Sequence, residues 1–221
     1  MSYQLLEFIV LFAIAAFLLF KLRSVIGTRT GYEPGPSGAP GPAEGLAGDG
    51  IGRSEDEDDE MEAAAVRELD PSARSALAEI REVEPGFSLE EFLQGARSAY
   101  EMVLTAYEEG DRSTLQDLLT PDVYSAFEGV IASREEEGLK VDSRFIGVRD
   151  IKVEELRFDK ETAEADLTIR FVGELITSVR DAEGRVVEGD PNEIRRQTDV
   201  WTFSRVMGSP NPNWLLSATG D

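Results

Sequence analysis

Residues 88–110 read SLEEFLQGARSAYEMVLTAYEEG and carry the strongest helix signal in the chain. Ser88 with Glu91 three residues later is a capping box, and Phe87 before the cap can contact Phe92 one turn into the helix. Apolar residues then recur at the spacing of one helix face, and a terminal glycine is a typical stop. The stretch therefore predicts a long amphipathic helix with one buried face, formed by Phe92, Leu93, Ala96, Tyr100, Val103, Leu104 and Tyr107.

Weaker helix signals lie on both sides of this stretch. Asp70-Pro71 is an N-cap followed by proline at the first helical position, which predicts a short helix that ends near Glu82. After the long helix, a segment with three leucines is helical in pattern, and Thr120-Pro121 restarts a helix that ends at Gly138. The order is thus helix after helix through the first part of the folded region.

From Lys140 onward the apolar residues change to a two-residue period, which is typical of strands. Alternating segments near residues 145–156, 167–179, 194–206 and 214–218 are separated by polar turns. Helices first and neighbouring strands after them predict an α+β domain, with helices packed on one face of a curved antiparallel sheet. Such an arrangement often encloses a concave apolar pocket.

Large aromatic side chains of these elements are candidates for the lining of that pocket. The alternative is that they pack in the core, because core residues follow the same helical and strand spacing. The spacing favours the core and leaves the pocket as the alternative. The candidates are Phe92, Tyr100, Tyr124, Phe127, Phe171, Trp201, Phe203 and Trp214.

The N-terminus carries an almost unbroken apolar run from Leu5 to Phe20. Counted to Leu22 it extends roughly 27 Å as a helix, against a hydrocarbon core of about 30 Å, so it just spans a bilayer if Lys21 snorkels. The alternative is a cleaved signal peptide, but no basic residue precedes the run and no good Ala-x-Ala site follows it. We expect a transmembrane anchor over residues 1–23. Its defining residues, with the basic flank, are Leu5, Phe8, Phe12, Phe17, Phe20, Lys21, Arg23 and Arg29.

The basic flank also predicts the topology, since Lys and Arg next to a span stay on the cytoplasmic side. We expect a single-pass protein with a short outer N-terminus and a cytoplasmic domain. Residues 24–60 are rich in Gly and Pro and end in six consecutive acids, which predicts a disordered, extended linker. An accessory helical segment, residues 61–84, then precedes the α+β domain at residues 85–221.

The composition excludes several classes of function. The formal net charge is -22, which argues against nucleic acid and favours a basic partner, although such acidity often serves only solubility. The chain contains no His and no Cys, so histidine-based triads, thiolate chemistry and histidine-ligated zinc are excluded. The acidic run lacks the ligand spacing of a calcium loop. We therefore expect no metal, no cofactor and no catalytic residue.

Residues in three parts of the chain carry a resemblance in a fixed order. The first part lies just inside the apolar run, the second in the predicted helices and the third near the C-terminus. These residues are 20–31 (FKLRSVIGTRTG), then Phe92, Ala96, Ala99, Tyr100, Glu101, Val103, Leu115, Leu118, Leu119, Pro121, Val123, Tyr124, Phe127, Ile131, Arg134 and Gly138, and finally Trp201, Phe203, Arg205 and Asn213-Trp214-Leu215.

In this pattern the chain resembles the Tim44-like proteins, and in particular their bacterial, membrane-anchored TimA-type branch. The resemblance implies a non-enzymatic adaptor in the bacterial inner (plasma) membrane, acting in protein transport or membrane-protein biogenesis through a domain with a large apolar pocket. Together with the anchor, the tether and the acidity, it favours a protein partner with a basic or amphipathic segment. A lipid in the pocket is the alternative, because the domain would lie close to the membrane. The mitochondrial relative attaches peripherally and recruits an Hsp70 chaperone through a long N-terminal region. The Gly/Pro-rich linker has no such region, so we do not extend chaperone recruitment to this chain.

Two other classes of function stay open. A secretion-channel component with a similar domain would place that domain outside the cytoplasm, against the charge rule. We expect the curved sheet closed by helices to form a cystatin-like or NTF2-like cone. A pocket enzyme of this isomerase-like fold would use Asp166, Glu174 or Asp199 as general base and Tyr100 as donor.

Overall fold

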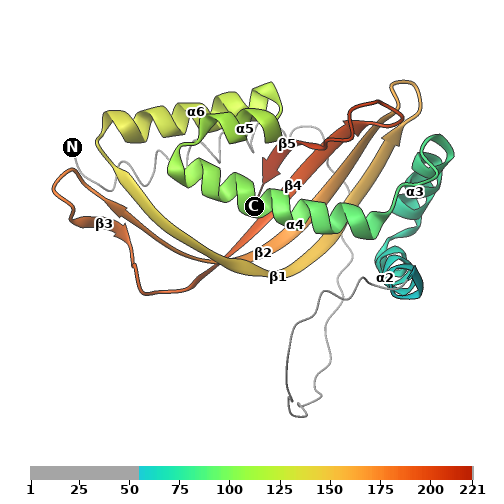
Figure 1. Cartoon of the computed structure of the whole chain (residues 1–221), viewed down its shortest axis with the longest axis horizontal. Coiled ribbons are helices and arrows are strands. Elements are labelled where there is room, and N and C mark those ends of the chain that lie inside the picture. The colour runs from blue at the N-terminus through green and yellow to red at the C-terminus, as the bar shows by residue number, and fades with distance from the viewer. Residues whose placement is uncertain (1–54, 221) are drawn as a thin grey trace, which may run out of the picture. The chain divides into compact units, whose positions relative to one another are not determined.

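The computed structural model describes residues 55–220, in which five helices precede five strands (Figure 1). All strand pairs are antiparallel, in the order β1-β2-β4-β5, and the short β3 pairs with the far end of β2. The helices are α2 (Glu55–Glu68), α3 (Pro71–Val83), α4 (Leu89–Glu109), α5 (Arg112–Leu118) and α6 (Pro121–Glu136), and the strands are β1 (Lys140–Asp159), β2 (Glu164–Arg180), β3 (Val186–Gly189), β4 (Arg195–Val206) and β5 (Leu215–Gly220).

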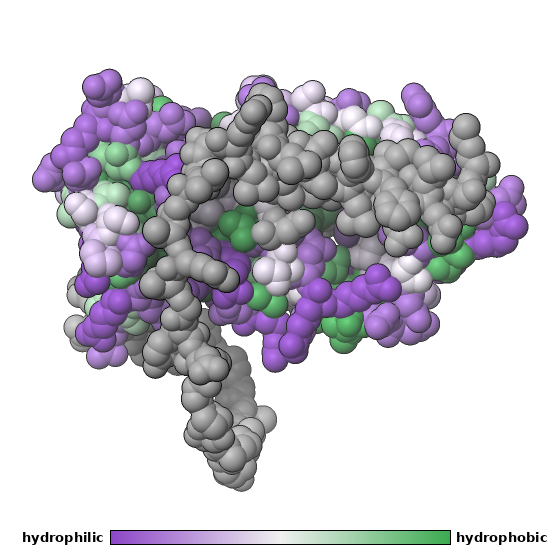
Figure 2. Space-filling view, turned by 180° about the vertical axis from the view of Figure 1, so that it is seen from behind, coloured by the Kyte–Doolittle hydropathy of each residue, from purple (hydrophilic) through white to green (hydrophobic). Residues whose placement is uncertain are grey.

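The sheet is curved, and α4 lies across its concave face (Figure 1). Along β2 the side chains alternate between buried and partly exposed, so that one face of the strand packs under the helices. Seen from behind, the described surface is largely hydrophilic (Figure 2). The predicted α+β class, with helices packed on an antiparallel sheet, is confirmed.

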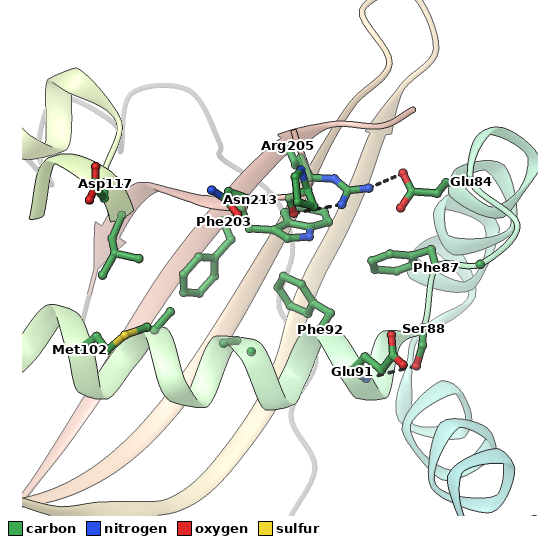
Figure 3. Close-up of a pocket in the computed structure, with 17 residues that line it drawn as sticks. Glu84, Phe87, Ser88, Glu91, Phe92, Met102, Asp117, Phe203, Arg205 and Asn213 are labelled. Atoms are coloured by element: carbon green, nitrogen blue, oxygen red, sulfur yellow. Dashed lines mark hydrogen bonds and ion pairs between the residues drawn. The ribbon is translucent and has the colours of Figure 1, made fainter. Parts of the chain in front are cut away.

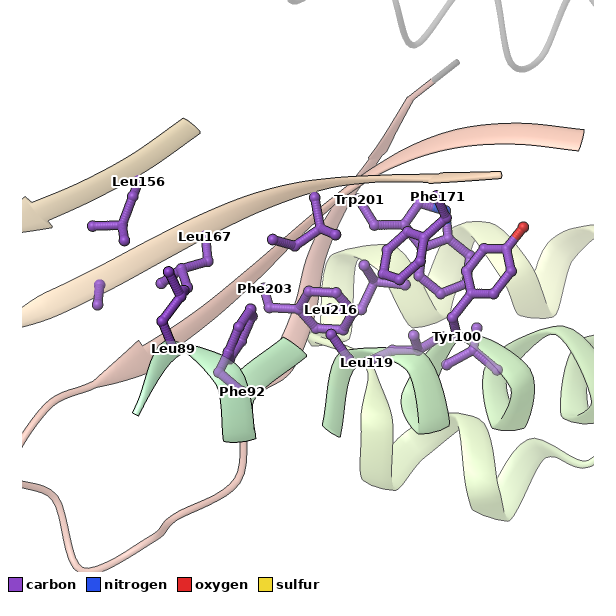
Figure 4. Packing of buried hydrophobic residues seen from close by; sticks show 14 of the residues in the cluster. Leu89, Phe92, Tyr100, Leu119, Leu156, Leu167, Phe171, Trp201, Phe203 and Leu216 are labelled. Carbon is purple, nitrogen blue, oxygen red and sulfur yellow. The ribbon is translucent and has the colours of Figure 1, made fainter. Parts of the chain in front are cut away.

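The core forms where α4 meets the sheet (Figure 4). Tyr100 is fully buried there, stacked on Phe171 at 4.5 Å between ring centroids and 4.7 Å from Trp201. Leu119 and Leu216 join α5 to β5 through an isolated parallel bridge, and the amide of Thr120 donates to the carbonyl of Leu216 at 3.0 Å. The face of α4 that the sequence predicted to be buried is thus the face that covers the sheet.

The predicted termini of α4 are confirmed. Ser88 is the N-cap, and its Oγ accepts a hydrogen bond from the amide of Glu91 at 3.2 Å. Phe87 contacts Phe92 with ring centroids 6.4 Å apart. Gly110 ends the helix in the left-handed region, at φ 72°. Asp70 likewise caps α3 by accepting from the amide of Ala73 at 2.9 Å.

The acidic run is helical where an extended linker was expected. α2 begins at Glu55, inside the segment that the sequence placed in the linker. Acids at a helix N-terminus are stabilised by the helix dipole, and the Ala-rich residues that follow propagate the helix. Helix formation thus prevails over the repulsion between neighbouring acids, and residues 55–60 are helical and not an extended linker.

α3 belongs to the main core. Leu77 and Ile80 are buried, with 2% and 0% of their surfaces exposed, together with Ala73. The segment that we set apart as accessory thus contributes one of its two helices to the core of the domain.

The anchor predicted over residues 1–23 lies outside the described residues, as does the linker up to residue 54. Within residues 55–220, no helix combines the length and the apolar character needed to cross a bilayer.

The sequence did not reveal β3 as a separate strand. Gly189 ends β3 with φ 74°, and a Cβ at this position would lie 2.2 Å from the carbonyl oxygen of Thr177. Only glycine fits there, because the clash is with backbone. The close approach lets the chain leave β3 beside β2 and return as β4.

Candidate functional site

A groove of about 470 Å³ opens beside the N-terminal half of α4 (Figure 3). Its walls come from the α3–α4 loop, from α4, from the end of α5, from β4 and from the loop that joins β4 to β5. These segments are distant in sequence and meet because α4 crosses the sheet at this end. The lining residues are Glu84, Gly86, Phe87, Ser88, Glu91, Phe92, Gly95, Ala96, Ala99, Met102, Asp117, Leu118, Phe203, Arg205, Pro212, Asn213 and Trp214.

Four aromatic rings form the apolar part of the groove. Phe92 lies at their centre, with its ring centroid 4.9 Å from Trp214 and 6.0 Å from Phe203. Phe87 lies 5.9 Å from Trp214 and closes the side formed by the α3–α4 loop. Tilted and edge-to-face contacts of this kind hold the rings in defined positions. Phe87, Phe92 and Phe203 are only 8%, 7% and 2% exposed, so these rings form a preformed apolar floor, and Trp214 is the ring that is partly exposed in the groove.

Arg205 is the cation of this lining, and its charge is compensated within the groove. Its Nη2 pairs with Glu84 Oε2, its Nη1 donates to the carbonyl of Pro212 at 3.1 Å, and its guanidinium lies 5.3 Å from the Trp214 ring centroid. Burial alone would raise the pKa of Glu84, but the hydrogen bonds from Arg205 and the Gly208 amide outweigh it and hold the pKa below its ordinary value. The pair fixes one end of the groove.

Two further acids give the rim a negative charge. Glu91 on α4 and Asp117 on α5 are exposed, and within residues 55–220 neither forms an ion pair. Since Glu84 already neutralises Arg205, the net charge of the lining comes from these two carboxylates. An apolar surface with an acidic rim is suited to a ligand that has an apolar face and basic flanks.

The structure separates the aromatic candidates into two groups. Phe92, Phe203 and Trp214 line the groove, and Phe92 and Phe203 belong at the same time to the buried core. The other five do not: Tyr100, Phe171 and Trp201 lie in the core, and Tyr124 and Phe127 lie on α6, with Phe127 packed 4.9 Å from the ring of Tyr107.

Sequence reasoning missed several lining residues. The sequence does not single out Met102, it marks Leu118 only as one leucine of a helical segment, and it marks Phe87 only as a contact for Phe92. The one available signal for Phe87 is its place just before the N-cap, which predicts contact with the pocket candidate Phe92. Nothing local indicated that Leu118 of α5 would face the same space as Trp214.

The residues of the enzyme hypothesis lie elsewhere. Tyr100 donates to Asp199 Oδ2 at 2.5 Å, and Gln197 Nε2 donates to the same carboxylate at 2.9 and 3.0 Å. Burial, and then the hydrogen bond to Asp199, raise the pKa of Tyr100 far above its usual range. A fully buried hydroxyl that holds its proton so firmly is suited to fixing the sheet to α4.

The two other acids of that hypothesis are also engaged. Asp166 accepts from Ser204, and Glu174 pairs with Arg196 at 3.0 Å and with Arg149 at 3.6 Å. None of the three acids, nor Tyr100, belongs to the lining of the groove.

The relatives with similar sequences are named as subunits of one kind of protein translocase. The subunit TIM44 of the mitochondrial import inner membrane translocase of Homo sapiens is 31% identical over 138 residues, which is 62% of this chain and 30% of that protein. TIM44-1 of Arabidopsis thaliana, a subunit of the same name, is 26% identical over 148 residues, 66% of this chain and 30% of that protein. The chain thus aligns with less than a third of the length of these relatives.

A solved structure with partial likeness is the intermembrane space region of the chloroplast protein ARC6. It has a TM-score of 0.40 and 12% identity, over 58% of this chain and 94% of that one. A likeness at this level supports no conclusion.

A match to a family model identifies the family of the domain. Residues 73–221, from within α3 to the C-terminus, match the Tim44-like domain. This match contains α4, the sheet and all residues of the groove lining, and it covers more than half of the chain. The protein therefore belongs to the Tim44-like domain family, whose relatives described above are subunits of protein translocases.

Proposed function

We propose that this protein is a membrane-anchored adaptor that binds a basic, amphipathic segment of a partner protein in the groove beside α4. The observation that carries the proposal is the pairing of four aromatic rings with an acidic rim in one preformed groove. The relatives are named as translocase subunits, which supports a role in protein transport or membrane-protein biogenesis.

The adaptor role also rests on the apolar run at the N-terminus. Residues 1–23 would hold the domain at a bacterial inner membrane, with the basic flank and the domain in the cytoplasm. Tethering raises the local concentration of the groove near any protein that emerges at the membrane. The function needs no chemistry, and the pair Tyr100–Asp199 is assigned to stability.

Site-specific photocrosslinking tests the groove. A benzophenone side chain placed at Met102, which lines the groove and is 45% exposed, should capture a discrete protein partner in intact membranes. The matched control is Ile146 on β1, which is 44% exposed and lies outside the lining. Equal products from both positions, or none from Met102, would contradict the proposal. Transfer of the label to lipid alone would identify the groove as a lipid site.

Salt separates the two parts of the recognition. Capture through the acidic rim should weaken as ionic strength rises, because exposed charges are screened beyond a Debye length of about 8 Å at 0.15 M salt. Neutralising the rim with Glu91→Gln and Asp117→Asn should remove most of this salt dependence. Salt dependence that persists in the double variant would place the basic contact elsewhere.

The anchor and its orientation are tested by cysteine labelling, since the chain has no Cys of its own. Ser2→Cys should react with a membrane-impermeant maleimide added to intact spheroplasts. Ser98→Cys, on the exposed side of α4, should react only after the membrane is opened. The reverse pattern would favour the secretion-channel hypothesis. Extraction of the protein from membranes by alkaline carbonate would contradict the proposed transmembrane anchor.

A further inference from the structure

The carboxylate of Glu62 on α2 joins three elements of the fold. Its Oε2 accepts from Ser88 Oγ at 2.9 Å and from the amide of Glu90 at 2.8 Å, while its Oε1 pairs with Arg81 Nη2 on α3. Ser88 and Glu90 form the N-terminus of α4. One side chain of α2 thus holds both the end of α3 and the start of the helix that crosses the sheet.

This carboxylate caps the N-terminus of α4, a role that a residue next to the helix in sequence usually has. The first amides of a helix have no partner within the helix and are satisfied by a cap. Here Ser88 Oγ accepts a hydrogen bond from the amide of Glu91, and Glu62, on a different helix, accepts one from the amide of Glu90. The side chain of Glu62 is 21% exposed. Burial would raise its pKa, but the hydrogen bonds from Glu90 and Ser88 and the charge of Arg81 hold it below the ordinary value.

The same contacts reach the wall of the groove. Arg81 Nε donates to the carbonyl of Phe87 at 3.2 Å, so its guanidinium connects Glu62 to the backbone of a groove residue. Ser88, held by Glu62, also lines the groove, and the ring of Phe87 contacts Trp214. Figure 3 shows Phe87 and Ser88 on the segment that leads into α4, beside the end of α2 and α3.

We propose that Glu62 is a positioning residue for the groove: by docking α2 on Arg81 and Ser88, it holds Phe87 in place as one wall. The importance of that wall for a partner rests on the proposed function, but the coupling itself does not. Docking of α2 and binding in the groove then stabilise each other, because linkage is reciprocal.

Fluorine NMR of the full-length protein labelled with 5-fluorotryptophan tests the coupling without a ligand. The protein has two tryptophans, and Trp214→Phe assigns them. Glu62→Ala should shift or broaden the Trp214 resonance and leave that of Trp201, which is buried in the core, unchanged. Glu62→Gln, which keeps one carbonyl oxygen for the amide of Glu90, should give a smaller shift. The matched control is Glu68→Gln, an exposed acid of the same helix, which should shift neither.

Hydrogen exchange gives a second measurement on the same samples. The amide of Glu90 should exchange about tenfold faster in Glu62→Ala, the size expected for a lost hydrogen bond to a charged group. Faster exchange with an unmoved Trp214 resonance would overturn the link to the groove. Unchanged exchange would overturn the role of Glu62. Equal shifts in Glu68→Gln would show a general charge effect and overturn both. If Glu62→Ala fails to fold, Glu62→Gln decides by the same criteria.

A basic amphipathic helical peptide of 18 residues, rich in Lys and Leu, separates this proposal from the proposed function. If it binds, its affinity should fall in Glu62→Ala and hold in Glu68→Gln, and equal affinities in all variants would contradict the coupling. If the peptide fails to bind the unmodified protein, the proposed function fails, and the NMR and exchange results still decide the role of Glu62.

Discussion

Replacing Tyr100 by Phe removes one hydroxyl from the centre of the domain. That hydroxyl donates to the carboxylate of Asp199 at 2.5 Å, and the ring around it is fully buried. A hydrogen bond to a charged group contributes about 1.5–3 kcal/mol to stability. Asp199 keeps its contacts with Gln197, so we expect a loss near the middle of this range, about 2 kcal/mol. For a chain of this size the melting temperature should fall by roughly 4–8 °C.

The assay is thermal and urea unfolding of the full-length protein, followed by near-ultraviolet circular dichroism. Tyr124→Phe is the matched control, because the Tyr124 hydroxyl makes no hydrogen bond within residues 55–220, and it should change stability by less than about 0.5 kcal/mol. A Tyr100→Phe protein as stable as the control would refute the reasoning, since the buried hydroxyl would then contribute nothing. Partner capture at the groove should persist in Tyr100→Phe, whereas a pocket enzyme would lose its donor.

Three further predictions follow from the close contacts and the carboxylates. Gly173→Ala should be destabilising, because a Cβ would lie 2.7 Å from the Tyr100 hydroxyl, and unfolding curves should show a smaller cost in the Tyr100→Phe background. Gly189→Ala should disrupt the pairing of β3 with β2, seen as faster amide exchange there, whereas Gly184→Ala, which meets no atom within 4 Å, should bear only the strain of its positive φ. Acid should loosen the groove wall: the pKa of Glu62 and of Glu84 lies below the ordinary 4.5, so their stabilisation is complete above that pH and is lost as pH falls through the lowered values. Across this pH range, the free energy of unfolding of Glu62→Gln should depend less steeply on pH than that of the unmodified protein.

Local signals predicted the helices of this domain well. The caps at Asp70 and Ser88 and the stop at Gly110 each depend on a few neighbouring residues, so the sequence contains all that decides them. The change from a helical to a two-residue period at Lys140 coincides with the start of β1. Period and capping were thus sufficient for the fold class.

The groove depends on contacts between distant residues, which no local pattern encodes. Trp214 follows a turn near the C-terminus, and it reaches Phe92 only because β4 and β5 bring that turn over the start of α4. The same limit explains why Tyr100 and Trp201 were grouped with Trp214 as pocket candidates. Their spacing marks them as buried against the sheet, but it does not say whether other side chains fill the space around them.

The strong acidity of the chain serves more than one purpose, and the structure distinguishes them by partner. Glu62 and Glu84 are partly buried and bound to arginines and backbone amides, so their charges hold the loops that form the groove wall. Glu91 and Asp117 carry charge on the rim of the same groove, where a ligand can meet it. Net charge alone cannot separate these roles, because it counts each carboxylate equally. A variant set that neutralises the rim should therefore change binding and leave stability nearly unchanged, while neutralising Glu62 should change both.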